Sequence, residues 1–273
     1  MKKNKSLLLS GPYVLWMLVF TLIPLGVVGY YALTDPDTGA FSWNNIRDLS
    51  LFLPTLGWSV WYSLVSALIC LVLGYPVAYF IAHRQPVTQK ILYMLVMLPM
   101  CMSFLLRTLA WVGLLEANGI INQLLGLLGL PAMEMIGTSG AVILGMVYNY
   151  LPYMILPLYA IIVKIDNRLI EAAEDLGCTP VQVFTKVVFP LSMPGILSGI
   201  TMVFVPAVST FYISQKLGGT DTMLIGDVIE RQFKSAGNPN LGAALSLVLM
   251  LLVFICTGIM NRFGSDEEGG VVV

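Results

Sequence analysis

The chain has few charged side chains and a single histidine. Only 11% of its 273 residues are Asp, Glu, Lys or Arg, whereas about a quarter of the residues in a soluble domain are charged. The phosphate-binding pattern G-x-x-x-x-G-K-[ST] does not occur, and neither do the catalytic patterns H-E-x-x-H and G-x-S-x-G. One histidine cannot supply most metal sites or catalytic triads, so we expect neither an enzyme nor a metal site.

Acidic residues are missing from the apolar parts of the sequence. Six windows are about as long as a helix that crosses a hydrocarbon core about 30 Å thick, and none of them contains Asp or Glu. The predicted spans are residues 12–33, 58–82, 91–115, 140–163, 190–214 and 241–261. With a mean hydropathy of +0.85, the sequence predicts an all-α polytopic membrane protein with six transmembrane helices in a single domain, residues 1–273. A proton-driven carrier usually needs a carboxylate at membrane depth, so this absence argues against that class.

The four cysteines show no metal or disulfide pattern. Cys70, Cys101 and Cys256 fall inside predicted spans, and Cys178 falls in a loop. We expect them to be small buried hydrophobic residues.

Lysine and arginine are distributed unevenly between the two sides of the predicted spans. If the N-terminus is inside, nine lie in inner segments: Lys2, Lys3, Lys5, Arg84, Lys90, Lys164, Arg168, Lys186 and Arg262. Four lie in outer segments: Arg47, Lys216, Arg231 and Lys234. Because cytoplasmic loops carry the excess of basic residues, we predict that both termini and the loop 164–190 are cytoplasmic. The outer loops are acidic, which suits a cationic substrate but is also common for solubility alone.

Arg107 is the one charged residue inside a predicted span. An ionisable residue at membrane depth is a functional candidate by default. A cation is a poor ligand for a cationic substrate, however, and long basic side chains near helix ends commonly snorkel. We expect Arg107 to snorkel, or to bind a carbonyl or a carboxylate such as that of Glu116.

The loop 164–190 has the signals of two short helices joined by a sharp turn. Asp166 or Asn167 can cap a first helix over about 168–176, and Gly177 can end it in a left-handed conformation. Residues 179–182, Thr-Pro-Val-Gln, predict a capping box for a second helix, which Pro190 would break as the fifth span begins. The first helix is short and acidic, which favours docking on a soluble partner over lying on the membrane.

This loop also carries a recognisable motif. Glu171-Ala172-Ala173, then Gly177, then Val187-x-Phe189-Pro190 resembles the EAA loop of ABC importer permeases, with Val and Phe in place of the family's Ile and Leu. Residues 71–76, 151–159 and 218–229 resemble the spermidine/putrescine permeases of that family. The resemblance covers about residues 10–262 and is strongest to the first of that system's two permease subunits.

The resemblance implies the type I ABC importer transmembrane fold and a multi-pass location in the bacterial plasma membrane. It implies ATP-driven import of polyamines, with residues 168–178 as the coupling helix. The residues expected to contact an ATPase subunit are Glu171, Ala172, Ala173, Asp175 and Gly177. The implied partners are a second permease, two ATPase subunits, an extracytoplasmic polyamine-binding protein and membrane lipid, but no nucleic acid. We expect no cofactor in this chain, because the ATPase subunits would bind ATP and Mg²⁺.

Polar and aromatic residues in the spans indicate a candidate substrate path. Carboxylates, hydroxyls, carbonyls and aromatic faces complement the ammonium groups of a polyamine. The candidates are Tyr148, Tyr150, Tyr153, Phe204, Phe211, Tyr212 and Trp111, with Asn149, Ser209 and Thr210 beside them and Glu116, Asp221, Asp227 and Glu230 at the outer mouth. An interfacial aromatic belt would explain Trp111 and Tyr212 equally well.

Two alternatives remain open at this point. The first is the same transporter class with another cargo, such as an organic amine, an iron complex or an oxyanion. The second is a stand-alone carrier or channel, which would transport without ATP or partner subunits.

Overall fold

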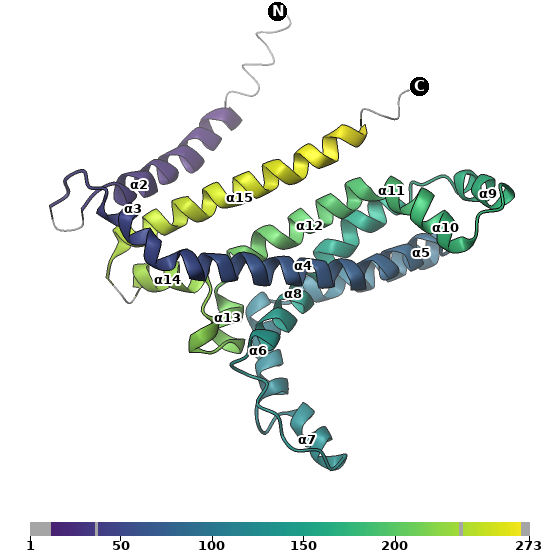
Figure 1. Ribbon diagram of the computed structural model, residues 1–273, viewed down its shortest axis with the longest axis horizontal. Coiled ribbons are helices and arrows are strands. Elements are labelled where there is room, and N and C mark those ends of the chain that lie inside the picture. The colour runs from purple at the N-terminus through teal and green to yellow at the C-terminus, as the bar shows by residue number, and fades with distance from the viewer. Residues whose placement is uncertain (1–11, 36–37, 235–236, 269–273) are drawn as a thin grey trace, which may run out of the picture. The chain divides into compact units, whose positions relative to one another are not determined.

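The protein is described by a computed structural model that covers residues 12–35, 38–234 and 237–268 (Figure 1). Within these residues the regular structure is helical, apart from two isolated bridges that pair Thr34 with Phe41 and Gly137 with Gly218. The predicted all-α class is therefore confirmed. Lys2, Lys3 and Lys5, which entered the orientation argument, lie outside the described residues.

The helices vary widely in length. In chain order they are α2 (Ile23–Ala32), α3 (Asn44–Asp48), α4 (Leu53–Ala82), α5 (Pro86–Met97), α6 (Phe104–Leu115), α7 (Ile120–Leu127), α8 (Ser139–Ile162), α9 (Asn167–Asp175), α10 (Pro180–Val183), α11 (Phe189–Leu191), α12 (Met193–Val208), α13 (Tyr212–Leu217), α14 (Ile225–Lys234) and α15 (Pro239–Glu268). Short 3₁₀ or π turns adjoin them at η1 (Leu18–Leu22), η2 (Leu49–Phe52), η3 (Leu98–Cys101), η4 (Phe184–Val188) and η5 (Thr220–Thr222).

Long apolar helical stretches cover four of the six predicted windows. They are Pro12–Ala32, Asn44–Ala82, Ser139–Ile162 and Pro239–Met260. A fifth stretch, Phe104–Leu127, also has the length and composition of a span, and a bent pair of helices over residues 180–208 can count as a sixth. The third and fifth windows differ from the prediction.

The third window, 91–115, is not one helix. α5 ends at Met97, η3 tightens the chain around Pro99, and α6 begins only at Phe104. Met102 and Ser103 have extended backbone angles, with ψ of 148° and 131°. Pro99 cannot donate a backbone hydrogen bond, and hydropathy does not register such a break because the residues around it are all apolar.

The fifth window, 190–214, is bent near its start and ends early. Residues Pro180–Leu191 and Met193–Val208 meet at an angle of 64°. The prediction that Pro190 breaks the helix is wrong, because Pro190 lies in the first turn of α11, where a missing N–H is tolerated. The bend comes two residues later at Ser192, and the helix ends at Val208 instead of continuing to residue 214.

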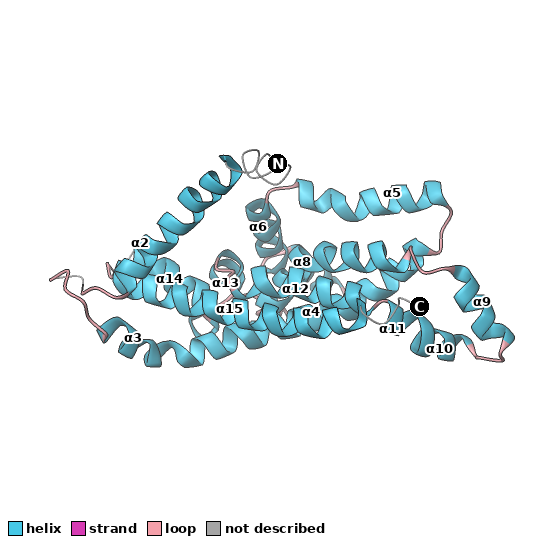
Figure 2. Ribbon diagram, turned by 90° about the horizontal axis from the view of Figure 1, so that it is seen from above, coloured by secondary structure: helices cyan, strands magenta, loops and turns pink. Residues whose placement is uncertain are grey.

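The chain packs as two compact units: residues 1–56 with 228–252, and residues 57–227 with 253–273. In the larger unit, α8 lies along α12, and α4 packs on α8 (Figures 1 and 2). A Cβ on Gly195 would lie 3.1 Å from Cβ of Ile161, and one on Gly199 would lie 2.6 Å from Sδ of Met154. The Gly195-x-x-x-Gly199 spacing therefore permits the close approach of α12 to α8.

In the smaller unit, amide side chains from α3 and α15 bind the segment that follows α2. The carbonyl of Thr34 accepts hydrogen bonds from Nδ2 of Asn45 at 2.8 Å and from Nδ2 of Asn240 at 2.6 Å. Both amides are buried, and Ala32 packs beside Ala243 in the adjacent apolar cluster. These bonds satisfy the backbone where α2 has ended and connect it to the start of α15.

The larger unit has two candidate functional regions, which lie at opposite ends. Figures 1 and 2 place α9 and α10 at one end, whereas α13 and the start of α6 lie toward the other. α8 runs between them, because its first turns lie against α13 and its last residue, Ile162, precedes α9 by a short turn.

Candidate functional site

The first region is the helix α9 and the turn that ends it. Oδ1 of Asp166 accepts a hydrogen bond from the backbone N–H of Arg168 at 3.0 Å, which decides the cap between the two predicted candidates. Gly177 has φ of +84°. The N–H of Cys178 bonds to the carbonyl of Ala173, and the N–H of Gly177 to that of Glu174. This pair of bonds is a Schellman motif, which needs the left-handed residue that Gly177 supplies.

A second helix begins directly after this turn. The side chain of Thr179 accepts from the N–H of Gln182, and Oε1 of Gln182 accepts from the N–H of Thr179 at 2.9 Å. The capping box predicted from the sequence is therefore present. The turn between the two helices is fixed by local hydrogen bonds on both sides.

The residues of α9 are not buried by the rest of the chain. Glu171, Ala172, Asp175 and Gly177 are exposed, and Ala173 is half-buried. Leu176 at the tip is 86% exposed. An apolar side chain held outward on a rigid turn is what a docking contact requires, since its desolvation would stabilise a complex.

Aromatic rings connect this loop to α4. Tyr75 is buried, and its ring centre lies 5.4 Å from that of Phe184 and 6.1 Å from that of Phe189. Its hydroxyl lies 2.7 Å from Oγ of Ser192, which in turn donates to the carbonyl of Phe189. Tyr75 therefore donates to Ser192 at the 64° bend. The sequence analysis did not single out this cluster, because Tyr75 lies more than 100 residues from Phe184, Phe189 and Ser192.

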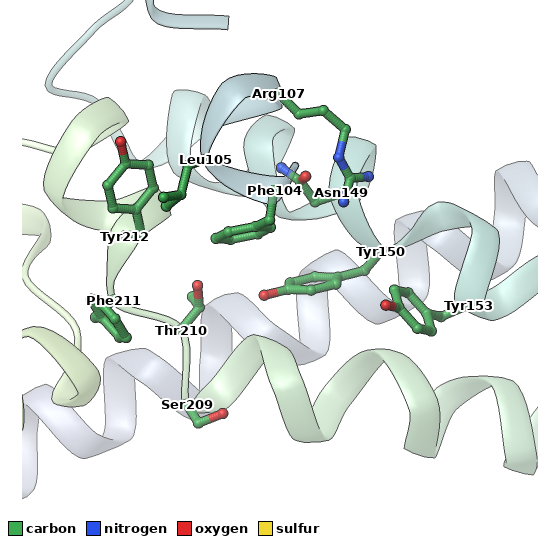
Figure 3. Close-up of a pocket in the computed structure, with 10 residues that line it drawn as sticks. All are labelled: Phe104, Leu105, Arg107, Asn149, Tyr150, Tyr153, Ser209, Thr210, Phe211 and Tyr212. Carbon is green, nitrogen blue, oxygen red and sulfur yellow. The ribbon is translucent and has the colours of Figure 1, made fainter. Parts of the chain in front are cut away.

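The second region is a cavity of about 400 Å³ between α6, α8 and the segment that follows α12 (Figure 3). Its lining residues are Phe104, Leu105, Arg107, Asn149, Tyr150, Tyr153, Ser209, Thr210, Phe211 and Tyr212. Figure 3 shows Arg107 and Asn149 on one side and Ser209 and Thr210 on the other, with the Tyr150 ring between them. The Tyr150 hydroxyl donates to the carbonyl of Pro206 at 3.3 Å.

Seven of the predicted path residues meet in this cavity: Asn149, Tyr150, Tyr153, Ser209, Thr210, Phe211 and Tyr212. Three others do not line it. Trp111 and Tyr148 pack against each other with ring centres 5.3 Å apart, and Phe204, only 2% exposed, lines a separate apolar cavity of about 200 Å³ with Cys256 and Met260. Their role in a substrate path stays a prediction.

Two of the four predicted outer carboxylates, Asp227 and Glu230, have local partners in this conformation. Oδ2 of Asp227, which is 2% exposed, accepts from the N–H of Leu224 at 2.9 Å at the start of α14. Glu230 pairs with Lys234 at 2.6 Å. Glu116 is exposed at the end of α6, and the side chain of Asp221 lies outside the described part of the structure. Asp227 thus caps a helix, so it does not face open space as a cation acceptor.

The burial and the partners of Arg107 differ from those predicted. Only 6% of the residue is exposed, so it does not snorkel. Among the described residues it forms no ion pair, with Glu116 or any other carboxylate, and its Nε and Nη1 have no hydrogen-bond partner. Phe104 and Leu105, also absent from the predicted path, enter the cavity because α6 starts at Phe104 after the break at Ser103.

Comparison with known proteins identifies the class of this chain. Residues 71–265 match the family of binding-protein-dependent transport system inner membrane components, and the chain belongs to that family. Its members are transport permeases, in agreement with the expectation that the chain is not an enzyme.

Similar sequences point to one group of permeases within this family. A spermidine/putrescine transport system permease protein from Haemophilus influenzae is 40% identical over 254 residues, which are 88% of this chain and 88% of the relative. A protein of the same description from Escherichia coli is 36% identical over 247 residues, 87% of this chain and 90% of the relative. The resemblance to spermidine/putrescine permeases inferred from short motifs therefore extends over most of the sequence.

Solved structures agree on the fold. The chain matches a protein of a bacterial ABC transporter that imports the acidic polysaccharide alginate, with a TM-score of 0.81, 17% identity, and coverage of 97% of this chain and 99% of that one. It also matches an inward-facing methionine ABC transporter with a TM-score of 0.61, 18% identity, and coverage of 81% and 97%. The fold is that of a type I ABC importer permease, a multi-pass membrane protein.

Proposed function

We propose that this chain is the first of two permease subunits in an ATP-driven importer of polyamines. The relatives that share 36–40% of its residues are spermidine/putrescine permeases. The observation that carries the proposal is α9, an exposed helix closed by the left-handed Gly177 at the position of the EAA motif. A helix that only connected two spans would not need an exposed Leu176 at its tip.

The proposed assembly contains a second permease, two ATPase subunits and an extracytoplasmic polyamine-binding protein. The ATPase subunits would bind ATP and Mg²⁺, because this chain has no phosphate-binding loop. It would lie in the bacterial plasma membrane with both termini and the loop 164–190 in the cytoplasm. The contact with an ATPase subunit would be made by Glu171, Ala172, Ala173, Asp175 and Gly177.

The path by which α9 would act on the cavity follows the covalent chain. α9 leads through α10 and η4 to the bend at Ser192, and α12 then runs to Val208. Ser209, Thr210 and Phe211, the next residues, line the cavity. A push on α9 that rotates the bent pair would therefore move one wall of the cavity relative to α6 and α8, and this would alternate access between the two faces.

Replacement of Gly177 tests the coupling role. We expect Gly177→Leu to abolish ATP-driven spermidine uptake in proteoliposomes that contain the whole transporter, while ATP hydrolysis and membrane insertion persist. A side chain is strained at φ of +84°, and this distorts the turn that presents Leu176.

Gly129→Leu is the matched control. Gly129 also has a positive φ of +74°, and at both positions nothing lies within 4 Å of an added Cβ. The two variants thus carry similar backbone strain, but only one lies in the proposed coupling loop. Equal uptake by the two variants would count against the proposal.

A second cargo class has one observation in its favour. The only charged side chain lining the described cavity is a cation, Arg107, which would attract an oxyanion or a carboxylate and repel a polyamine. Measuring which solutes the partner binding protein retains, spermidine or carboxylate-bearing ones, decides between the cargoes. A stand-alone channel predicts transport by this chain alone without ATP.

A further inference from the structure

Arg107 is a buried cation, and two of its guanidinium nitrogens have no partner among the described residues. It lies on α6 with 6% of its surface exposed, and Nε and Nη1 have neither a hydrogen bond nor a carboxylate within ion-pair distance among the described residues. A buried charge is strongly disfavoured unless it is paired and hydrogen-bonded. No carboxylate of the described residues serves as that partner, so the guanidinium is open to an anionic partner from outside these residues.

Asn149 presents a second unpaired group in the same cavity. It lies on α8, is 1% exposed, and donates through Nδ2 to the carbonyl of Gly145 at 2.9 Å. Its Oδ1 has no hydrogen-bond partner among the described residues. Asn149 and Arg107 both line the cavity (Figure 3). Two elements thus bring unsatisfied polar atoms to one side of the cavity.

The lining residues of the cavity differ in polarity and exposure: the charged and amide side chains are buried, and several apolar and aromatic side chains are exposed. Arg107 and Asn149 are buried, whereas Leu105 is 48%, Phe211 41% and Tyr153 36% exposed. None of the ten lining residues is Asp or Glu. A group that enters past the exposed aromatic residues would meet the guanidinium at the end of its path, which fits a short apolar stem with an anionic tip.

We propose that this cavity is a carboxylate socket and that Arg107 is its anchor. A planar guanidinium binds a carboxylate through two parallel N–H···O bonds, which would satisfy Nε together with Nη2, or Nη1 together with Nη2. The Oδ1 of Asn149 would accept from a donor that accompanies the carboxylate, such as a bound water. The carboxylate has two possible sources: an Asp or Glu side chain of the second permease, or a free carboxylate-bearing solute.

Neutralisation of Arg107 also reconciles the cavity with the proposed cargo. An uncompensated cation on the wall would repel a polyamine, whereas a paired one leaves aromatic faces and hydroxyls that suit ammonium groups. This argument, and the second permease as the source of the carboxylate, rest on the proposed function. The observation that atoms of Arg107 and Asn149 are unpaired is independent of the proposed function.

The direct test is a structure of the assembled wild-type transporter in lipid. We expect a carboxylate oxygen about 3 Å from a guanidinium nitrogen of Arg107, contributed either by the second permease or by a solute. Arg107 surrounded by water alone, or turned out of the cavity, would overturn the proposal. This measurement does not depend on how any variant folds.

Variants distinguish the two sources. We expect Arg107→Gln to lower co-purification of the second permease about tenfold or more if that subunit supplies the carboxylate, because one partner of a buried ion pair is then left alone. Arg107→Glu should then be rescued by an Asp or Glu to Arg change in the second permease. If the source is a solute, acetate should raise the thermal midpoint of the wild-type complex and not that of the Arg107→Gln complex.

Arg84→Gln is the matched control, because Arg84 is exposed over the ring of Phe80 and its loss leaves no buried charge. The socket would be overturned if both the rescue and the acetate effect failed and Arg107→Gln co-purified the second permease as well as Arg84→Gln does.

Spermidine uptake by the wild-type complex reports separately on the cargo. Its absence would contradict the polyamine assignment while the structural test still decides the socket.

Discussion

At the scale of single residues, the cavity wall is set by a glycine that does not itself line the cavity. Gly226 lies in the first turn of α14, and a Cβ there would stand 2.5 Å from the carbonyl oxygen of Thr210 and 2.9 Å from that of Ser209. Backbone atoms cannot rotate away as side-chain ends can. Gly226 therefore allows the segment after α12 to lie against α14, and this close contact positions Ser209 and Thr210.

We expect Gly226→Ala to lower the free energy of unfolding by about 1–3 kcal/mol, the usual cost of overpacking, and to reduce transport. The measurements are the thermal midpoint of the purified complex and spermidine uptake. Gly57→Ala is the control, since nothing lies within 4 Å of its added Cβ in α4, and alanine favours a helix. Equal midpoints for the two variants would show that the wall can shift freely.

At the scale of elements, the bent pair of helices at Ser192 is held to α4 by one hydroxyl pair and by edge-on and tilted ring contacts. The hydroxyls of Tyr75 and Ser192 are 2.7 Å apart, and Phe184 and Phe189 cover the Tyr75 ring. This cluster lies between the proposed coupling helix and α12. A loss of the hydroxyl pair should loosen the link between the loop and the spans without removing either element.

We expect Tyr75→Phe to remove a buried hydrogen bond worth about 1 kcal/mol and to lower the number of spermidine molecules imported per ATP hydrolysed. Tyr93→Phe is the control, because Tyr93 is half-buried and contacts the ring of Tyr159. The measurement is the ratio of uptake to hydrolysis in proteoliposomes. An unchanged ratio in Tyr75→Phe would exclude a coupling role for this hydroxyl.

At the scale of the whole molecule, the orientation in the membrane decides whether α9 can meet an ATPase. Leu176 beside α9 is 86% exposed, and Leu127 at the end of α7 is 84% exposed. Figure 1 places α9 and α7 far apart in the larger unit. The topology predicted from the sequence puts Leu176 in a cytoplasmic loop and Leu127 in an outer loop, so cysteines at these two positions form a matched pair that tests it.

We expect an impermeant maleimide added outside intact cells to label Leu127→Cys and not Leu176→Cys, with the reverse in inside-out vesicles. The four native cysteines should first be replaced by serine, since Cys101 is exposed. Crosslinks from Ala172→Cys to an ATPase subunit would extend the result. Labelling of Leu176→Cys from outside would contradict the positive-inside assignment and the coupling role together.

The local signals in the sequence were sufficient for α9 and its turn. The cap at Asp166, the left-handed Gly177 and the Thr179–Gln182 capping box all involve residues within a few positions of each other. Such hydrogen bonds depend on neighbours in the chain, so residue type predicts them. Hydrophobic windows likewise predicted four long helices, because burial in lipid depends on composition alone.

Breaks inside apolar windows were not predicted. The chain leaves the helix at Met102 and Ser103 and again at Ser209, Thr210 and Phe211, yet both segments are apolar enough to pass as continuous spans. Hydropathy averages over a window and does not register the backbone bonds that Pro99 cannot make.

The sequence by itself determined the class of the protein, its long helices and the short helix α9 with its turn, since each depends on composition or on neighbouring residues. Only the tertiary structure decided that Arg107, Asn149 and Thr210 share one cavity, because they come from segments more than 40 residues apart. Only the tertiary structure decided that Arg107 is buried. Which face of a helix meets another depends on packing between distant elements, and a local pattern carries no such information.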